Sequence, residues 1–490
     1  MSSVSRRDFL KTTLAGGLSV SLAGWGARSF AHARILGAND DIRVGFVGFR
    51  SKGAQHIEVF REIPGVRVVA LCDVDQEILD RELEKSKALN ESVTAYRDVR
   101  ALLDNKDIDA VVVATPNHWH SLIGVWACQA GKDAYVEKPI SHNIWEGRKL
   151  VEAARKYNRI VQAGTQNRSD TGFREAVAYL KEGHLGKPLW AHGVWFKERE
   201  SIGKVSKPQP VPETVDYDLW LGPARKEPLM RANLHYDWHW FWEYGNGDMG
   251  NLGAHQIDDI RFAFNLDKLP RRVMSYGGRF VFDDNGETPN TQVGVYDYPD
   301  FPVLIETRNL PMAKGRRAMD HLRGARDGAN VFQFENGYLV GGRGGATIYD
   351  HAGTRLQQFP GDGGGMHQAN FIEAMRGRKR EQLHAEIYEG HISAVLCHMA
   401  NISYQIGKAT APEAIKEMLL DDQESGETLE RIKDHLAKNE VNLARTPLIS
   451  GPWITLDQEK ERFVGSFAKQ ANGLVKRKKY RKPFVINDKV

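Results

Sequence analysis

Cysteine is scarce in this sequence: 490 residues contain only Cys72, Cys128 and Cys397, which stand far apart. No two of them have the short spacing of a structural zinc site, and an odd number cannot form a complete disulfide framework. The sequence therefore does not support a fold held by disulfides or zinc, and each cysteine is expected to fill a core position.

Long apolar runs are missing after the first 35 residues, which excludes a protein that crosses a bilayer several times. A strong charge of one sign is missing too, because 67 Lys and Arg face 63 Asp and Glu. Without residues 1–33, which hold four basic and one acidic side chain, the balance is 63 against 62. This excludes a mainly electrostatic nucleic-acid binder. We interpret the one basic run, residues 476–482, as a solvated face rather than a polyanion site.

Residues 1–33 have the order of an export signal. Arg6 and Arg7 precede Phe-Leu-Lys, a weakly apolar stretch follows, and Ala-His-Ala ends at Ala33. This order predicts a twin-arginine (Tat) signal peptide, the Tat export machinery as a partner, and a periplasmic or extracytoplasmic location without a stable membrane anchor. An uncleaved anchor and an ordinary amphipathic start of a domain are the alternatives. Tat export moves folded proteins, which suits a protein that collects a cytoplasmic cofactor before it leaves.

Residues 38–163 alternate strand-like and helix-like segments. The strand-like segments are residues 42–48, 66–72, 109–114 and 133–136, and polar helical segments separate them. Such alternation predicts right-handed βαβ units and a parallel sheet, in a protein of the α/β class.

The first strand-to-helix turn, from Gly48 to Gly53, reads Gly-Phe-Arg-Ser-Lys-Gly. A dinucleotide-binding turn has a further glycine where Arg50 stands, so a plain structural turn is the alternative. Asp73 follows Gly53 by 20 residues and ends the second strand, where a carboxylate binds ribose hydroxyls. We therefore expect NAD as the cofactor, held by Gly48, Phe49, Arg50, Gly53 and Asp73. NADP stays possible because the Arg50 guanidinium could hold a 2′-phosphate.

Polar residues follow the third and fourth strands at the same edge of the sheet. In an open parallel sheet, ligands bind beyond the carboxyl ends of the strands. We therefore expect further cofactor contacts from both strand ends, namely Thr115, Pro116, Asn117, His120, Glu137 and Lys138. Lys138, fixed by the following proline, is also a candidate for proton transfer. Capping residues in a loop and an ordinary surface lysine are the alternatives.

These motifs, above all Glu137-Lys138-Pro139, resemble the Gfo/Idh/MocA family of glucose–fructose oxidoreductase and inositol dehydrogenase. The stretch from Tyr135 to Arg168 is similar to an exported branch of that family. The resemblance implies a Rossmann domain (residues 38–163), a substrate-binding α/β domain on a large, mostly antiparallel open sheet (164–408), and an extension packing back on the body (409–490). It adds Gln166 to the cofactor contacts and Arg168 to the substrate contacts.

The second domain is rich in aromatic residues, with six of the 11 tryptophans between residues 190 and 242. Aromatic faces stack on sugar rings, but aromatic residues also pack well in a hydrophobic core. Only a few of these residues are therefore expected at a pocket. We predict that Trp242 and His239 contact the substrate. Strand-like runs follow at residues 273–276, 291–298, 303–307, 331–334 and 337–340, and two amphipathic helices within 366–408.

A glycine-rich segment, residues 245–258, contains Asp248, Asn251 and His255, which we expect to contact the substrate. By resemblance His255 is the catalytic acid/base, while Lys138 positions the substrate hydroxyl and tunes its pKa. Asn251 stands where the family has Asp, and an amide cannot act as a base. Proton transfer is then left to His255 and Lys138, or to Asp248. Histidines and aspartates near this segment match no known metal-site spacing, so no metal is predicted.

The predicted function is NAD(P)-dependent oxidoreduction of a secondary alcohol on a sugar or polyol, with a tightly bound cofactor. A small-molecule carbohydrate is the expected substrate, nucleic acid is not an expected partner, and a homo-oligomer through the open sheet is expected. One alternative is a glycoside-cleaving enzyme that regenerates its own NAD. The other is an inert sugar-binding protein that kept the fold.

Overall fold

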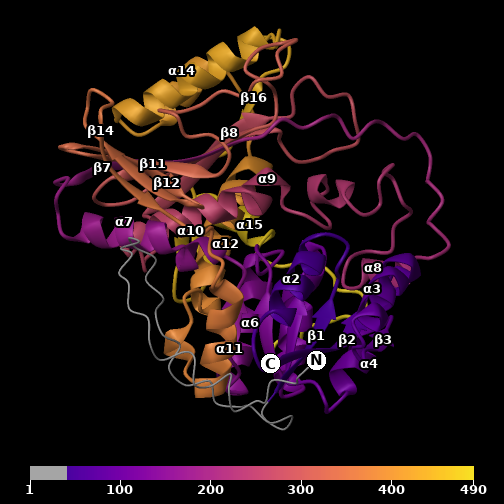
Figure 1. Ribbon diagram of the computed structural model, residues 1–490. Coiled ribbons are helices and arrows are strands. Elements are labelled where there is room, and N and C mark those ends of the chain that lie inside the picture. The colour runs from indigo at the N-terminus through magenta and orange to yellow at the C-terminus, as the bar shows by residue number, and fades with distance from the viewer. Residues whose placement is uncertain (1–40) are drawn as a thin grey trace, which may run out of the picture. The chain divides into compact units, whose positions relative to one another are not determined.

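The computed structural model describes residues 41–490, so the predicted export signal lies outside the described residues. The described chain from Ile42 to Val490 contains two large sheets, one parallel and one mostly antiparallel (Figure 1). No helix among residues 41–490 is long and apolar enough to cross a membrane. All three cysteines are free and buried, as expected of core residues.

The first sheet has six parallel strands in the order β3-β2-β1-β4-β5-β6. They are β1 (Ile42–Val47), β2 (Val66–Cys72), β3 (Thr94–Tyr96), β4 (Ala110–Val113), β5 (Asp133–Val136) and β6 (Val161–Ala163). The helices of this part are α2 (Lys52–Arg61), α3 (Gln76–Ala88), α4 (Val99–Asp104), α5 (Asn117–Gln129) and α6 (Ile144–Lys156). The predicted strands are confirmed. The short edge strand β3 escaped prediction because its three residues are largely exposed and show no apolar run.

The strand order reverses at β1, which pairs with both β2 and β4. Loops that leave β1 and β4 run to opposite sides at such a point and open a crevice between them. The crevice lies where the sequence placed its polar clusters, at the carboxyl ends of the strands.

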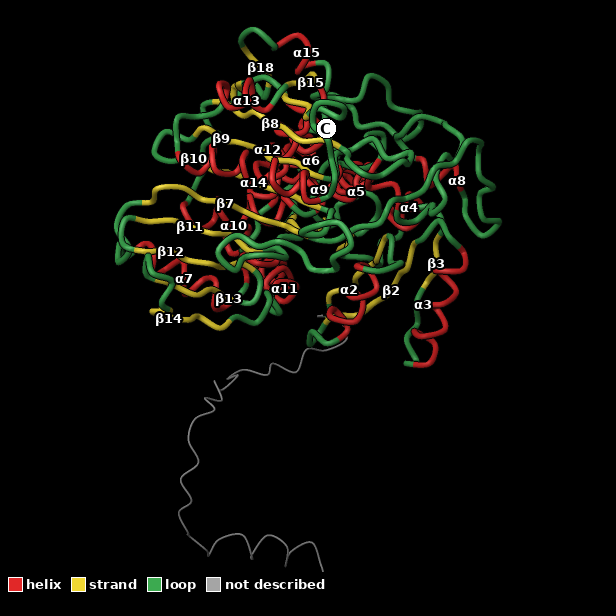
Figure 2. Tube along the Cα trace, turned by 90° about the horizontal axis from the view of Figure 1, so that it is seen from above, coloured by secondary structure: helices red, strands yellow, loops and turns green. Residues whose placement is uncertain are grey.

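The second sheet has ten strands in the order β14-β13-β12-β11-β7-β10-β9-β8-β16-β15, which lie side by side in Figure 2. Only β7 and β10 pair in parallel, so the predicted large, mostly antiparallel sheet is confirmed. Its strands are β7 (Pro188–Phe196), β8 (Arg272–Gly278), β9 (Thr291–Asp297), β10 (Pro302–Arg308), β11 (Ala329–Phe334), β12 (Gly337–Gly342), β13 (Gly345–Tyr349), β14 (Arg355–Pro360), β15 (Lys408–Thr410) and β16 (Leu448–Ser450).

Helices cover both faces of this sheet. One face packs against α7 (Thr171–Lys181), α10 (Gly253–Phe264) and α12 (Ile387–Gln405). The opposite face, at β8 to β10, packs against α13 (Pro412–Met418) and α14 (Gln423–Lys438) from the C-terminal part, and Figure 1 shows α14 across the sheet from α10. The C-terminal extension therefore covers this face at β8 to β10, while the homo-oligomer through the open sheet stays a prediction.

The two helices predicted within residues 366–408 are present as α11 (His367–Gly377) and α12. Near the C-terminus, Phe484 lies against Trp119 of α5, with ring centroids 5.4 Å apart. The remaining short elements are α8 (Tyr217–Leu221), α9 (Gly247–Asn251), α15 (Ala468–Asn472), β17 (Thr455–Asp457) and β18 (Arg462–Val464).

The interpretation of residues 476–482 as a solvated face is wrong in part. The Arg477 side chain is buried and donates to Glu243 Oε1 at 2.8 Å, and Arg481 donates to Asp218 Oδ1 at 2.7 Å. Lys476 lies over the ring of Trp145 at 3.6 Å. These cations fix the end of the chain to the body, which charge counting along the sequence could not show.

Candidate active site

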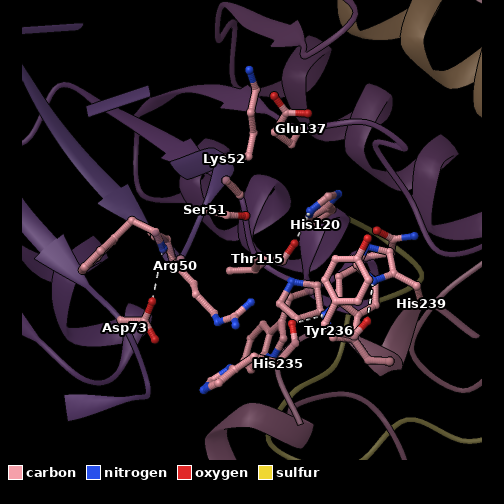
Figure 3. Close-up of a pocket in the computed structure, with 18 of the residues that line it drawn as sticks. Arg50, Ser51, Lys52, Asp73, Thr115, His120, Glu137, His235, Tyr236 and His239 are labelled. Carbon is pink, nitrogen blue, oxygen red and sulfur yellow. Dashed lines mark hydrogen bonds between the residues drawn. The ribbon is translucent and has the colours of Figure 1, made fainter. Parts of the chain in front are cut away.

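A pocket of about 420 Å³ lies at the carboxyl ends of the parallel strands, between residues of both sheets' domains. Most predicted site residues line it: Gly48, Phe49, Arg50, Asp73, Thr115, Pro116, Asn117, His120, Glu137, Lys138, Gln166, His239, Asn251 and His255. Figure 3 shows Arg50, Asp73, Thr115, Glu137 and His239 around it. Lys138 and His255, predicted as the catalytic pair, therefore share one pocket although they are 117 residues apart in the chain.

The turn after β1 requires glycine at both of its glycine positions, Gly48 and Gly53. Gly48 has φ +77°, and a Cβ there would lie 2.9 Å from Thr115 Cγ2. A Cβ on Gly53 would lie 2.0 Å from the Gly48 carbonyl oxygen. Gly53 therefore packs α2 against the turn and does not line the pocket. Arg50 is exposed and extends from the turn toward the pocket (Figure 3).

Asp73 fixes the same turn. One carboxylate oxygen accepts the Phe49 N–H at 3.1 Å and the other accepts the Asp75 N–H at 3.0 Å. Burial raises the pKa of Asp73, although these hydrogen bonds oppose the rise. Because an ionised carboxylate can accept about four hydrogen bonds, two positions remain for ribose hydroxyls. Residues at this pocket thus fit a dinucleotide.

Glu137 and Lys138 are each held by a partner from elsewhere. Glu137 Oε1 lies 2.8 Å from His56 Nε2. Burial alone would raise the pKa of Glu137, but the hydrogen bond and charge of His56 hold it well below its usual range. Lys138 Nζ donates to the Asn251 carbonyl oxygen at 2.8 Å and to Asn251 Oδ1 at 3.1 Å. Burial lowers the pKa of Lys138.

Asp248 does not line the pocket and is not placed to act as a base. It is buried, accepts from Arg199 at 3.0 Å and from Asn309 Nδ2 at 2.6 Å, and receives the Asn251 amide N–H at 3.4 Å. The Asn251 amide therefore points its nitrogen at Asp248 and its oxygen at Lys138. Asp248 acts on the pocket by orienting Asn251, and through it Lys138, and by pairing with Arg199, which lines the pocket.

Two of the histidines that line the pocket, His255 and His239, are neutral at ordinary pH. Burial and the charge of Lys138 lower the pKa of His255 to about 3, and its Nδ1 is buried without a partner in the described chain. Burial lowers the pKa of His239 to about 4. His239 Nδ1 lies 2.6 Å from the Tyr236 carbonyl oxygen, which can only accept, so Nδ1 carries the proton and Nε2 keeps its lone pair. Both residues can accept a proton.

Two further predicted substrate contacts lie away from the pocket lining. Arg168 is buried and donates to both carboxylate oxygens of Asp258, at 2.8 and 3.0 Å, so its charge holds helix α10. Trp242 does not line the pocket, and its backbone N–H donates to Glu287. The aromatic count in this region could not tell the pocket tryptophans, Trp220 and Trp238, from their neighbours.

No motif in the sequence indicated a covering segment, residues 211–244, which contacts the first domain beside Asp73. Its Thr214 carbonyl oxygen accepts from Gln76 N at 2.9 Å and from Arg97 at 2.9 Å. Its His235 ring lies 2.8 Å from Asp75 Oδ2. Trp220, His235, Tyr236 and Trp238 of this segment line the same pocket as Asp73. The segment thus forms one wall of the site expected to bind the dinucleotide.

Among residues 41–490, no group of three or more His, Cys, Asp or Glu side chains is placed to hold a metal ion. The histidines near the glycine-rich segment are instead bound to backbone carbonyls or carboxylates, such as Tyr236 O and Asp75.

Comparison with known proteins defines the class. Residues 42–165 match the family described as "Oxidoreductase family, NAD-binding Rossmann fold", and residues 179–276 match "Oxidoreductase family, C-terminal alpha/beta domain". Residues 42–165 thus match an NAD-binding Rossmann domain. The two matched segments correspond to the two domain models of the Gfo/Idh/MocA oxidoreductase family.

Two curated relatives illustrate the range of this similarity. Inositol 2-dehydrogenase of Salmonella typhimurium is 28% identical over 184 residues, 36% of this chain and 52% of that protein. A glycosyl hydrolase family 109 protein of Shewanella pealeana is 31% identical over 173 residues, 31% of this chain and 37% of that protein. The chain therefore spans about half or less of the length of the curated relatives it matches.

Solved structures share the fold. The WlbA dehydrogenase from Bordetella pertussis, in complex with NADH and UDP-GlcNAcA, is 19% identical with a TM-score of 0.54, covering 73% of this chain and 94% of that one. An oxidoreductase domain protein from Kribbella flavida is 18% identical with a TM-score of 0.55, covering 73% and 96%.

Proposed function

We propose that the protein is an NAD-dependent oxidoreductase that acts on a secondary alcohol of a sugar or polyol. The observation that carries this proposal is the meeting of Lys138 and His255 in the pocket that also holds the glycine turn and Asp73. Polyol and sugar-nucleotide names among the relatives and neighbours support the substrate class.

In this proposal the turn from Gly48 to Gly53 and Asp73 bind the dinucleotide, which supplies a hydride acceptor. The Lys138 ammonium donates a hydrogen bond to the substrate hydroxyl and stabilises the negative charge that develops on its oxygen. His255 Nε2 or Nδ1 takes the hydroxyl proton. Its low pKa in the empty pocket comes from burial and the Lys138 charge, so a developing alkoxide between the two residues favours protonation.

A second candidate is a glycoside-cleaving enzyme that uses its NAD and restores it in each turnover. The covering segment favours this candidate, because a dinucleotide enclosed by Trp220, His235 and Tyr236 exchanges slowly with a free pool. The similarity to glycosyl hydrolase family 109 supports it as well.

The test is a carbohydrate panel in which both NADH and new reducing ends are measured. Net NADH supports the first candidate, and cleaved glycoside without net NADH supports the second. Purified protein is also denatured and the released dinucleotide identified by mass spectrometry. We expect NAD(H), whereas mainly NADP(H) would contradict the ribose role of Asp73, and no dinucleotide would favour the inert sugar-binding protein. Lys138→Met, which removes the ammonium but keeps the stem, is the inactive control.

We also propose that the protein is exported by the Tat route with its cofactor bound. The order of residues 1–33 supports this proposal. Changing Arg6 and Arg7 to lysine should leave the protein in the cytoplasm. Recovery of that variant from the periplasm in normal amounts would contradict the proposal.

A further inference from the structure

The pocket has far more positive than negative charge. Its lining holds seven cationic side chains, which are Arg50, Lys52, Arg97, Lys138, Lys197, Arg199 and Arg343. It holds three carboxylates, Asp73, Asp98 and Glu137. All three already accept hydrogen bonds, from Phe49, Arg100 and His56 respectively. An excess of this size needs anionic ligands to balance it.

The dinucleotide accounts for only part of this excess. Arg50 and Lys52 belong to the turn that faces its pyrophosphate, and Arg97 donates to the carbonyl oxygens of Val74 and Thr214 beside Asp73. Arg199 is paired with Asp248, and Lys138 donates to Asn251. Lys197 and Arg343 remain, and both come from the second domain.

Neither of these two side chains has a protein partner. Among residues 41–490 no hydrogen bond, ion pair or ring contact is made by the Lys197 ammonium or the Arg343 guanidinium, and both residues are exposed. Arg343 also lines a second cavity of about 220 Å³, whose lining includes five glycines and the carboxylate of Asp327, with which Arg343 makes no ion pair. Its guanidinium is thus bordered by open space on two sides rather than packed in protein.

The backbone holds Arg343 in a fixed position even though the side chain is free. It sits in the tight turn between β12 and β13, followed by Gly344 with φ +92°. Buried Asp170 accepts the Gly344 N–H at 2.9 Å and the Gly363 N–H at 2.6 Å. These hydrogen bonds hold the backbone of the turn, so Arg343 starts from a defined position beside the pocket.

Arg343 and Lys197 line the same pocket as His255 and Asn251. The charge of Arg343 also contributes to the lowered pKa of His255. The Lys197 carbonyl oxygen accepts from Asn309 Nδ2, and the same amide nitrogen donates to Asp248, which orients Asn251. The two cations therefore reach the pocket of the predicted acid/base from the β12–β13 turn and from the residue after β7.

We infer that the substrate carries an anionic group, a carboxylate or a phosphate ester on its sugar ring, and that Lys197 and Arg343 bind this group. The inference rests on the proposed function, since it specifies which sugars enter the pocket. A guanidinium and an ammonium together suit an anion because charge-assisted hydrogen bonds are stronger than neutral ones. Neutral sugars would leave both cations unpaired.

The test measures binding and chemistry separately on the purified holoprotein. Calorimetry at low salt compares glucuronate and glucose 6-phosphate with glucose, and galacturonate with galactose, so that the carboxylate and phosphate arms are distinguished. Absorbance of the bound cofactor at 340 nm reports hydride transfer from the same sugars. Variants are Arg343→Ala, Lys197→Ala and Arg343→Lys. The matched control is Arg355→Ala, an exposed arginine on the neighbouring strand β14 that does not line the pocket.

At least one acid should bind ~10-fold or more tightly than its neutral partner. Arg343→Ala and Lys197→Ala should each weaken the binding of acidic sugars by ~10- to 100-fold, and Arg343→Lys should weaken it less. None of the three variants should change the binding of neutral sugars by more than about twofold. Acids that bind no better than neutral sugars, or variants that weaken both equally, would overturn the inference. If neutral sugars reduce the cofactor as efficiently as acidic sugars, the anionic-substrate inference is contradicted and the proposed oxidoreductase function is supported. If acidic sugars bind through Arg343 without any absorbance change, the anion site is supported and the oxidoreductase function is contradicted.

Discussion

Asn251 illustrates how one residue can depart from a family pattern for a physical reason. Its amide donates to Asp248 and accepts from Lys138, which only a group with both a donor and an acceptor can do. An aspartate there would place a second carboxylate about 3.4 Å from Asp248 Oδ1. Because like charges at such a distance oppose joint ionisation, Asn251 and Asp248 suit each other. The base is then left to the histidines.

Removing the side chain of Lys138 or of His255 should lower turnover more than removing the amide of Asn251. Lys138→Met and His255→Ala should each lower turnover by roughly two to four orders of magnitude, because each removes a group that moves or polarises a proton. Asn251→Ala should cost less, since it only loosens Lys138. Steady-state rates on the true substrate measure this order, and cofactor content of the purified variants serves as the control. Full activity of both Lys138→Met and His255→Ala would direct attention to His239.

The sequence was informative about residues whose role is local. The glycine turn, Asp73 and the polar ends of β4 and β5 follow from strand alternation, and the resemblance added Gln166 and His255. Arg343, Lys197 and His235 could not be predicted, because they reach the pocket only through long-range pairing of strands and loops. Asp248 and Arg168 look like site residues along the chain, yet folding gives each a buried charged partner.

At the scale of elements, helix α14 covers the large sheet at β8 to β10 with apolar residues at helical spacing, Leu429, Ile432 and Leu436. Ile432 and Leu429 pack on the face that includes Val295 and Leu304. Charged contacts support this packing: His192 Nδ1 lies 2.8 Å from Glu424 Oε1, and both side chains are buried. Burial lowers the pKa of His192, but the hydrogen bonds with Glu306 and Glu424 outweigh it, so the pKa is raised.

The packing of α14 predicts that substitutions at two neighbouring positions change the free energy of unfolding by very different amounts. Ile432→Ala removes a fully buried side chain and should lower the free energy of unfolding by about 2–5 kcal/mol. Lys433→Ala, one residue on and at the surface, should change it by less than about 0.5 kcal/mol. Urea unfolding of both variants gives the comparison. Equal, small effects would mean that α14 does not dock in solution.

Strands of the second sheet were predicted where apolar runs are bounded by turn residues, as in β8 to β12. Strand β7 was hidden among aromatic residues that we assigned to a pocket or core, and β14 has only one buried residue among six. Helix α14 and strand β16 belong to a C-terminal part whose packing depends on a sheet formed by distant residues. The sequence analysis predicted an extension that packs back on the body, but local pattern could not predict that it covers the sheet at β8 to β10.

At the scale of the described chain, buried neutral histidines make stability depend on pH. Burial lowers the pKa of His118 and His398 to about 3 and of His367 and His435 to about 4. An unfolded histidine takes up its proton near pH 6.5, so the unfolded chain binds more protons between about pH 6.5 and 4. The free energy of unfolding should therefore fall as the pH is lowered through this window. The raised pKa of His192 has the opposite effect on the pH dependence of stability.

Urea unfolding at pH 7.5, 6.0 and 5.0 measures this dependence. Each histidine that stays neutral contributes a slope of up to about 1.4 kcal/mol per pH unit. His398→Gln should reduce the slope, whereas His184→Gln, at an exposed position, should not. A stability that is constant from pH 7.5 to 5.0 would show that these histidines are not kept neutral.

The covering segment should control how long the dinucleotide stays bound. His235→Ala removes the contact with Asp75 and should speed dinucleotide release by about tenfold, the loss expected for one hydrogen bond to a charged group. The decay of bound NADH fluorescence after dilution measures release, and His184→Ala is the control. Release that is unchanged in His235→Ala would show that the segment does not hold the cofactor.

If the proposed oxidoreductase keeps its dinucleotide beneath residues 211–244 through every turnover, it should follow ping-pong kinetics. One sugar would transfer a hydride to the bound nicotinamide and depart as a ketone or lactone before a second compound could accept that hydride through the same opening. Double-reciprocal plots at several fixed concentrations of the second compound should then be parallel lines. Added free NAD would change neither slope nor intercept, and the electron donor and the electron acceptor would both be small molecules that enter the pocket around Lys138 and His255.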